Sequence, residues 1–424
     1  MRTALAATWT LLLGMALLML GAGLQGTLVG LRASLEGFPT LLSGFMLAAY
    51  YLGYMAGSMM TPGMVNTVGH VRVFAALTSI ASVLILLQGV FVAPLPWTLV
   101  RIVFGFCFAG IYVVAESWLN GRVDNEHRGL LLSIYMLVCY GGLGLGQLLL
   151  NVADPRSTLL FILVSVLISV AMVPMALTPA SAPEINVPVR VSPRNLFRRS
   201  PLGVAGVAVA GAVSGTFFSL GAIYAAGMGF STFEVSLFMA VAILAGCVSQ
   251  LPIGRLSDRM DRRTMVIAVC VLAAVSATAA WWLADYFRIV FFTMVAAYGA
   301  TSLTLYSLSS AHVNDLVPDE EKLGASSTLI LVNGAGAFIA PIVVAGVMEL
   351  AGNGAFLLLL AAMHVLLAAY ALVRKKRRAA IKGEHKTRFV GTPPGTASSG
   401  ELYGHVSDRD DAPSPRPSAG SAER

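Results

Sequence analysis

The ten residues GRLSDRMDRR, at positions 254–263, place two aspartates, four arginines and one glycine between two long apolar segments. The apolar segments lie near 233–254 and 265–284, and each is long enough to cross the hydrocarbon core of a bilayer as a helix. A short charged connection between two such helices predicts a membrane protein whose charged residues gather in its loops.

The composition of the whole chain supports the same class. Of its 424 residues, 57% are apolar and 12% are charged, whereas soluble domains carry about 25% charged residues. A segment inside lipid must satisfy its own backbone hydrogen bonds, so we expect each apolar stretch to be a helix. The first stretch is too long for a cleaved signal peptide, and we expect it to be retained. Twelve spans are predicted, near 9–31, 41–61, 73–93, 97–117, 130–152, 158–178, 202–226, 233–254, 265–284, 288–310, 325–348 and 354–373.

The basic residues are distributed unevenly between the two sides of these spans. One side carries Arg2, Arg72, Arg122, Arg128, Arg190, Arg194, Arg198, Arg199, Arg255, Arg259, Arg262, Arg263, Lys322 and the run RKKRR at 374–378. The other side carries Arg32, Arg156 and Arg288. This asymmetry predicts that both termini lie in the cytoplasm. It also accounts for the net charge of +7 without a nucleic-acid partner.

An internal repeat divides the chain into two halves. GFPTLLSGFM at 37–46 resembles GFSTFEVSLFM at 229–239, and PGMVNTVGHVR at 62–72 begins 192 positions before GRLSDRMDRR. We therefore expect a six-helix half at 1–178, a cytoplasmic linker at 179–200 and a second six-helix half at 201–373. Residues 374–424 are rich in Gly, Ser, Pro, Asp and Arg, which predicts a disordered, basic and polar cytoplasmic tail.

Two motifs make a specific family resemblance visible. GRLSDRMDRR resembles the G-x-L-x-D-R-x-x-R-R loop of the major facilitator superfamily, with Asp261 where glycine is usual, and the first copy of the loop is degraded. Arg101, Gly105 and Ala109 form an R-x-x-x-G-x-x-x-A pattern that resembles the fourth-helix signature of proton-driven exporters in that family. ESWLN at 116–120, together with the degraded first loop, resembles a subgroup of bacterial transporters without assigned substrates.

The resemblance implies an all-α membrane protein with the twelve-helix fold of that superfamily, in the inner membrane of a bacterium. It implies secondary active transport of a small solute by alternating access. The more specific expectation is export coupled to protons. A membrane receptor or assembly factor of the same shape, which transports nothing, is the alternative. We expect a monomer whose partners are the solute, the lipid bilayer and protons.

The charged loop is predicted to act as a gate between the two halves. Gly254 would permit the turn, and Asp258 would face a helix N-terminus in one state and water in the other. Its arginines would bridge to a carboxylate such as Glu116. The alternative is that the arginines only anchor the loop inside the cell. The gating residues proposed are Gly254, Asp258, Arg259, Arg262, Arg263, Arg72 and Glu116.

Polar residues inside the spans are the candidates for substrate binding or coupling. Arg101 lies about one turn inside its span, where an unpaired arginine is costly, so it either serves function or extends to the interface. The resemblance implies a site lined by the first, fourth, seventh and tenth helices, which ranks Arg101 with Gln25 and Tyr224. The amides among the candidates could instead form interhelical hydrogen bonds. The further candidates are Tyr54, Gln147 and Asn333.

Other classes of chemistry find little support in the residues. The spans contain no pair of catalytic groups and no nucleotide-binding motif, so neither an enzyme nor a cofactor is expected. His312 and His364 have no metal-ligating neighbours in the sequence, and no metal site is expected. The cysteines suggest no disulfide framework, since all of them fall within spans: Cys107, Cys139, Cys247 and Cys270.

Overall fold

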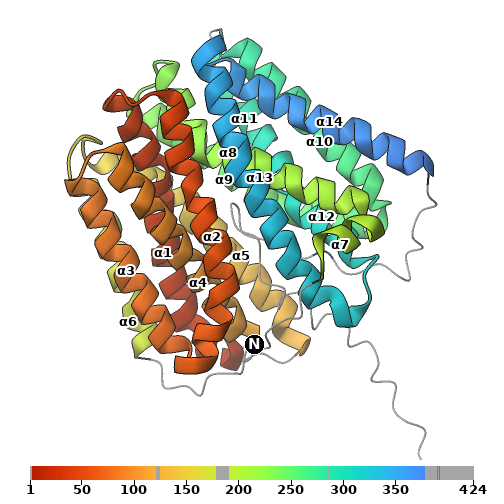
Figure 1. The fold of residues 1–424 in the computed structure, drawn as a ribbon, viewed down its shortest axis with the longest axis horizontal. Helices are drawn as coiled ribbons and strands as arrows, with labels where there is room; N and C mark the ends of the chain where they lie inside the picture. Colours follow the sequence, from red (N-terminus) through yellow and green to blue (C-terminus); the bar gives the residue numbers. More distant parts are fainter. Residues whose placement is uncertain are drawn as a thin grey trace, which may run out of the picture.

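The computed structural model describes residues 2–120, 125–177, 191–284 and 286–377, together with Phe389 and Gly391. These residues form two helical bundles that lie side by side, with the second bundle inclined to the first (Figure 1). The loop around Arg122, most of the predicted linker at 179–190 and the rest of the predicted tail fall outside the described residues.

The first half consists of six long helices. They are α1 (Arg2–Leu35), α2 (Thr40–Val68), α3 (His70–Val90), α4 (Pro94–Asn120), α5 (Asn125–Leu148, continued by the short 3-10 helix η1, Leu149–Val152) and α6 (Leu159–Ala176). Helix α2 packs against α4, α1 against α5, and α3 against α6. Glycines permit the closest of these contacts, because Gly53 on α2 leaves room for the backbone of Ile102 on α4.

The second half repeats this packing. Its elements are α7 (Pro193–Arg199), α8 (Pro201–Gly227), α9 (Thr232–Arg259), α10 (Arg262–Leu283), α11 (Arg288–Ser302), α12 (Leu305–Asn314), the 3-10 helix η2 (Asp319–Glu321), α13 (Lys322–Ala351) and α14 (Ala355–Arg377). Helix α9 packs against α11, α8 against α13, and α10 against α14, which are the equivalents of the three pairs in the first half.

The helices agree with the predicted spans. Eleven helical segments of the described chain are long and apolar enough to cross a membrane, with α11 and α12 counted as one. The twelfth is α2, which has 29 residues and is less apolar because it carries three tyrosines. The fold is therefore the predicted one, all-helical with two similar halves of six spans each.

The tenth span departs from the prediction because it is broken. A continuous helix at 288–310 was expected, but α11 ends at Ser302 and α12 begins at Leu305. Two threonines flank the break, and the hydroxyl of Thr304 donates to the backbone oxygen of Thr301 over 2.7 Å. Such local side-chain bonds compete with the helical pattern. The break leaves the Leu303 carbonyl free to accept from Gln250 Nε2 of α9 at 3.4 Å.

The predicted boundaries of the linker and the tail also need correction. Residues 193–199, assigned to the linker, form α7, where Leu196 is fully buried. The hydroxyl of Thr328 on α13 donates to the Val191 carbonyl and holds the start of this segment. The first residues of the predicted tail, 374–377, are the last turn of α14. Packing of Leu196 against α8 and α13 stabilises α7, although its sequence lacks a long apolar run.

The two ends of the molecule differ in charge and in contact between the halves. We name the end that holds the α2–α3 turn and the α9–α10 turn the basic face, because Arg72, Arg255 and Arg259 are exposed there. The opposite face holds the other ends of these helices. There the Leu41 N–H donates to Glu349 Oε2 at 2.8 Å, which joins α2 to α13.

Contacts between the halves continue from the opposite face to mid-depth. Asn151 Nδ2 donates to Ser236 Oγ at 2.9 Å near the opposite face, and Gln250 Nε2 donates to the Tyr140 hydroxyl at 2.7 Å farther along α9. The helix pairs that join the halves most extensively are α2 with α13, α5 with α9, and α1 with α8. The structure thus shows a conformation in which the halves are bound together on the side away from the basic face.

Candidate functional site

Arg101 is the centre of a polar cluster inside the first half. Its side chain lies on α4 and is 8% exposed. Arg101 Nη1 donates to Gln25 Oε1 of α1 at 3.0 Å, and Nη2 donates to the Leu47 carbonyl of α2 at 3.4 Å. Gln25 in turn donates to Gln88 Oε1 of α3 at 3.5 Å. The guanidinium of α4 is therefore held within the bundle by α1 and α2, with α3 joined through Gln25, and does not extend to the interface.

The positive charge of Arg101 is compensated by neutral groups. The guanidinium carbon lies 4.8 Å from the centre of the Tyr50 ring, a favourable cation–π arrangement. Across the described ranges Arg101 forms no ion pair, and its Nε has no hydrogen-bond partner. A buried cation with a spare N–H is suited to bind an anionic group, because a carboxylate or phosphate accepts two parallel bonds from a guanidinium.

Two of the predicted site residues form interhelical hydrogen bonds. Gln147 Oε1 on α5 accepts from the Thr27 hydroxyl on α1. Asn333 Nδ2 on α13 donates to the Val207 carbonyl on α8 at 3.3 Å. Helices α5 and α1 in the first half correspond to α13 and α8 in the second. These two amides therefore tie equivalent helix pairs together, which is the alternative that the sequence left open.

The predicted tyrosines lie in different surroundings. Tyr224 stacks on Phe356 of α14 with ring centres 4.8 Å apart, so its ring packs inside the second half. Tyr54 lies beside Tyr50 at 5.9 Å and is also an electrostatic neighbour of Tyr306 on α12. Tyr54 thus connects the Arg101 cluster to the other half, whereas Tyr224 is part of an aromatic core.

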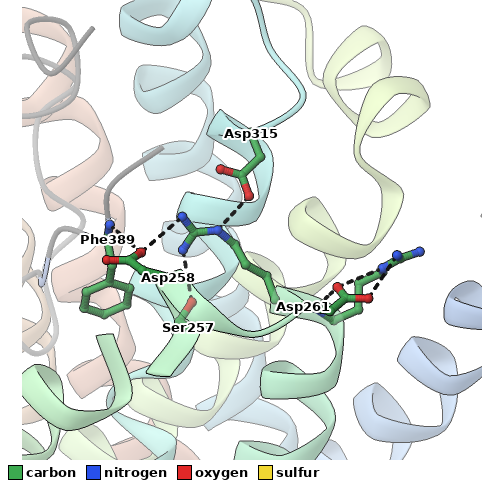
Figure 2. Close-up of polar contacts among 7 residues, drawn as sticks. Ser257, Asp258, Asp261, Asp315 and Phe389 are labelled. Carbon is green, nitrogen blue, oxygen red and sulfur yellow. Dashed lines mark hydrogen bonds and ion pairs between the residues drawn. The ribbon is translucent and has the colours of Figure 1, made fainter. Parts of the chain in front are cut away.

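Arg262 is the centre of the charged turn between α9 and α10, because its side chain contacts Ser257, Asp258 and Asp315, which are labelled in Figure 2. Its side chain is 1% exposed and forms a 2.6 Å ion pair with Asp315, whose side chain is also 1% exposed. Arg262 Nη1 donates to Ser257 Oγ at 3.0 Å, and Nη2 lies 3.5 Å from Asp258 Oδ1. The turn is therefore fastened to the end of α12 by a buried pair of charges.

Asp261, which stands where the resemblance led us to expect glycine, caps the start of α10. Its carboxylate accepts from the Arg263 backbone N–H at 3.0 Å and from Arg263 Nε and Nη2 at 3.2 Å and 3.0 Å. Partial burial alone would raise the pKa of Asp261, but the bonds from Arg263 outweigh it and lower the pKa below its usual value. The carboxylate is thus held ionised at the N-terminus of a helix, where negative charge is favourable.

The predicted role of Gly254 in the turn is wrong. Gly254 lies inside α9, five residues before its end, and it is not among the glycines with positive φ. The turn is made at Met260 and Asp261, both with extended backbone. In the first half the α2–α3 turn does use a glycine, Gly69, whose φ is +90°.

Asp258 and the remaining gate candidates lie at the basic face. Asp258 Oδ1 accepts from the Phe389 backbone N–H at 3.0 Å, in addition to its contact with Arg262 (Figure 2). Arg72 and Arg259 are exposed. Glu116 is 1% exposed on α4, whose packing partners are helices of the first half. The ion pairs described for Arg262 and Arg263 stay within the second half, so the bridge to Glu116 stays a prediction for another conformation.

The structure also explains His70, a residue of the degraded first loop to which the sequence assigned no role. His70 begins α3, and its Nε2 lies 2.5 Å from Ser117 Oγ. The edge of Trp118 meets the His70 ring at 5.7 Å between ring centres. Ser117 and Trp118 belong to ESWLN, so this motif contacts the turn of the degraded loop through His70. In the second half the equivalent turn is held by the charged pair Arg262 and Asp315 instead.

Several functional candidates were missed by sequence reasoning. Gln88 extends the Arg101 cluster, and Asp315 is the buried partner of Arg262. His364 is not isolated as its sequence context implied, because its Nε2 lies 3.1 Å from Ser302 Oγ. The position of Asp315, an acidic residue directly after the tenth span, was the signal in the sequence that could have identified it as a partner for the arginines of the turn. The apolar pair Phe389–Val390 in a polar tail was the signal for the tail contact.

Comparisons with known proteins agree with this architecture. The profile of the Major Facilitator Superfamily matches residues 11–313 and 233–408. An uncharacterized MFS-type transporter, YcaD, of Escherichia fergusonii is 27% identical over 304 residues, which are 71% of this chain and 78% of the relative. An uncharacterized MFS-type transporter of Enterobacter sp. strain 638 is 28% identical over 342 residues, 80% of this chain and 86% of the relative.

Solved structures show the same fold at low sequence identity. The nucleoside transporter NupG has a TM-score of 0.70 at 14% identity, covering 88% of this chain and 100% of its own. A bacterial homolog of the human lysosomal transporter Spinster, in an inward-facing and occupied conformation, has a TM-score of 0.68 at 15% identity, covering 87% and 96%. The xylose transporter XylE from E. coli, partially occluded and inward open, has a TM-score of 0.65 at 13% identity, covering 88% and 98%. The chain therefore belongs to the major facilitator superfamily and is a multi-pass membrane transporter with no assigned substrate.

Proposed function

We propose that the chain is a secondary active transporter that exports a small solute with an anionic group, in exchange for protons, by alternating access. The observation that carries the proposal is the state of Arg101, a buried cation that neutral groups hold and that keeps one N–H unused. A buried charge without a counter-charge costs free energy, and a solute carboxylate or phosphate would relieve that cost. Binding at Arg101 would therefore select anions.

The two halves supply the moving parts in this proposal. Contacts at the opposite face and at mid-depth join them in the present conformation, and Tyr54 places the Arg101 cluster next to the second half. Two of the similar solved structures are described as inward-facing or inward open. The excess of basic residues at the basic face supports an orientation with that face and both termini in the cytoplasm of a bacterium. With this orientation, the present conformation would also be open toward the cytoplasm. A single chain contains both halves and would suffice for transport.

Proton coupling requires a group that can release a proton, which arginine cannot do at physiological pH. Glu116 is the acid we propose for this role, because it is fully buried on the same helix as Arg101. Its electrostatic neighbours include Tyr54 and Tyr112. Protonation of Glu116 would remove a buried negative charge and so favour a different helix arrangement. Export, rather than uptake, rests on the resemblance of the Arg101 motif to that of proton-driven exporters.

Gate residues at the basic face complete the proposed cycle. Asp258 is half-buried and contacts both Arg262 and the tail, so its partners would change when the basic face closes. Arg72, Arg259 and Arg263 lie near the same face and would contribute to closure. A contact made in one state only is what biases an equilibrium between two states.

The test begins with a search for the solute and then measures its flux. Purified protein is screened by thermal unfolding against small carboxylates, organic phosphates and neutral solutes, and stabilising compounds are tested in proteoliposomes with and without a pH gradient. We expect anions to stabilise the protein and to move only when the gradient is imposed. Arg101→Gln is expected to lower flux roughly 10- to 100-fold, the effect of losing a hydrogen bond to a charged group.

Arg288→Gln is the matched control, because Arg288 is a half-exposed arginine at the opposite face and should leave flux unchanged. Neutral solutes moving as fast through Arg101→Gln as through the wild type would contradict anion binding. A solute flux that is the same with and without the pH gradient would contradict proton coupling. Stabilisation by a solute that is never moved would favour the alternative, a receptor or assembly factor with a transporter fold.

A further inference from the structure

Phe389 of the C-terminal tail binds the turn between α9 and α10 in this structure. Phe389 lies twelve positions beyond Arg377, the end of α14, yet its backbone N–H donates to Asp258 Oδ1 at 3.0 Å (Figure 2). Asp258 is the residue of the turn that the sequence singled out for gating. A backbone N–H bonded to a carboxylate is stronger than a bond between neutral groups, so the contact is specific.

Gly254 accommodates the aromatic ring of the same tail residue. A Cβ added at Gly254 would lie 2.5 Å from Phe389 Cδ1, a distance that real Cβ atoms do not reach. Glycine destabilises the interior of a helix, and its backbone conformation in α9 does not require it. The close approach of the Phe389 ring explains why glycine occupies position 254, whereas the geometry of the turn does not explain it. The ring also packs against the hydrophobic core of the transporter.

Two residues farther along, the tail reaches both halves. A Cβ added at Gly391 would lie 3.3 Å from Gln250 Oε1 on α9 and 3.6 Å from Met136 Cε on α5. Met136 belongs to the first half and Gln250 to the second, and Gln250 also forms the mid-depth hydrogen bond to Tyr140. Phe389 and Gly391 therefore lie between α5 and α9 on the basic-face side of that bond.

We propose that Phe389 and Gly391 act as an autoinhibitory plug that holds the transporter in the conformation seen here. This inference rests on the proposed alternating access, because closing the basic face brings α5 and α9 together where the segment lies. A segment that binds only the open arrangement shifts the equilibrium toward it. The tether raises the effective concentration of the segment to about the millimolar range, so weak contacts suffice.

The conformational test needs no knowledge of the solute. Spin labels are placed in a cysteine-free, full-length chain at Thr67 on α2 and Asn195 on α7, both exposed at the basic face. Helix α7 packs on α8 and α13, so its label reports the second half. Distances between the labels are measured by electron–electron double resonance in lipid nanodiscs. We expect one long distance in the wild type.

Phe389→Ala and Gly254→Ala each disturb the packing of the Phe389 ring and leave its backbone N–H in place. Each is expected to raise the ratio of short to long distances roughly tenfold, the change in an equilibrium ratio that loss of one packing contact produces. The double variant should shift no further than either single one, because both act on one contact. Phe197→Ala removes an exposed ring from α7 at the same face and should change nothing.

Unchanged distances in Phe389→Ala, or additive shifts in the double variant, would overturn the plug. A shift in distances without flux of any tested solute would leave the plug standing and refute the proposed transport instead. Where a transported anion has been found, Phe389→Ala should also raise its turnover. Lower turnover would show that the tail assists transport, which also contradicts autoinhibition.

Discussion

At the level of single residues, the turn between α9 and α10 depends on a buried ion pair. Arg262 and Asp315 are each almost fully removed from solvent and lie 2.6 Å apart, and Ser257 satisfies another N–H of the guanidinium. Taking two charges out of water is costly, so the pair is stable only while both members are present. Arg262 therefore does more than anchor a loop to the cytoplasm, since an anchoring arginine would be exposed at the interface, as Arg259 is.

Removing one member of this pair should destabilise the protein strongly. Asp315→Asn leaves the Arg262 charge buried and is expected to lower the free energy of unfolding by about 3–5 kcal/mol. The double variant Arg262→Met with Asp315→Leu should recover most of that loss, because neither charge then remains. Thermal unfolding of the purified variants in detergent measures both effects. A single variant as stable as the wild type would mean that water reaches the pair.

At the scale of helices, small residues set how closely pairs approach. Helices α2 and α4 are packed so tightly that a Cβ at Gly53 would lie 1.7 Å from the Ile102 carbonyl oxygen. Gly105 on α4 meets the backbone of Tyr50 in the same way. Tyr50 and Leu47 on α2 and Arg101 on α4 form the polar cluster, so the separation of these two helices sets its geometry.

Gly53→Ala should therefore damage both stability and the polar cluster. The added methyl group must push α4 away, and overpacking of this kind costs about 1–3 kcal/mol. Gly63→Ala is the matched control on the same helix, because nothing lies within 4 Å of a Cβ there. Thermal unfolding and anion binding should both be reduced in Gly53→Ala and preserved in Gly63→Ala. Equal behaviour of the two variants would mean that the α2–α4 contact is looser than described.

At the scale of the whole molecule, the orientation in the membrane follows from the charges. The basic face carries most of the basic residues of the loops, which predicts that this face and both chain ends lie in the cytoplasm. Reporter fusions after residues 36, 156 and 378 test the orientation. We expect external signals at 36 and 156 and a cytoplasmic signal at 378. An external signal at 378 would require the proposed export direction and the position of the plug to be reversed.

Much of the fold could be predicted because the lipid environment leaves few alternatives. Backbone groups inside lipid must be bonded within their own segment, so apolar length alone indicated the helices. The repeat of GFPTLLSGFM indicated that the second half packs as the first does. The break after Ser302 could not be predicted in this way, because threonine hydroxyls and Gln250 replace the helical bonds there.

The candidate site shows the same division. Arg101 could be selected from the sequence, because a charge inside an apolar span is costly wherever it lies. Its partners could not, since Gln25, Leu47 and Tyr50 are brought to it by the packing of α1 and α2. Gln147 and Asn333 looked like equal candidates in the sequence. The structure shows them bonded between helices.

The class of protein, the number of spans and their division into two halves could all be predicted from the amino-acid sequence. The signals were hydropathy, charge asymmetry and the internal repeat. These properties depend on local segments and their transfer into lipid. Three contacts could be identified only once the helices were placed in space: Asp315 pairs with Arg262, Gly254 accommodates a ring, and Phe389 reaches Asp258. Those contacts join residues 53 and 131 to 135 positions apart, and their formation depends on how the helices pack rather than on local sequence.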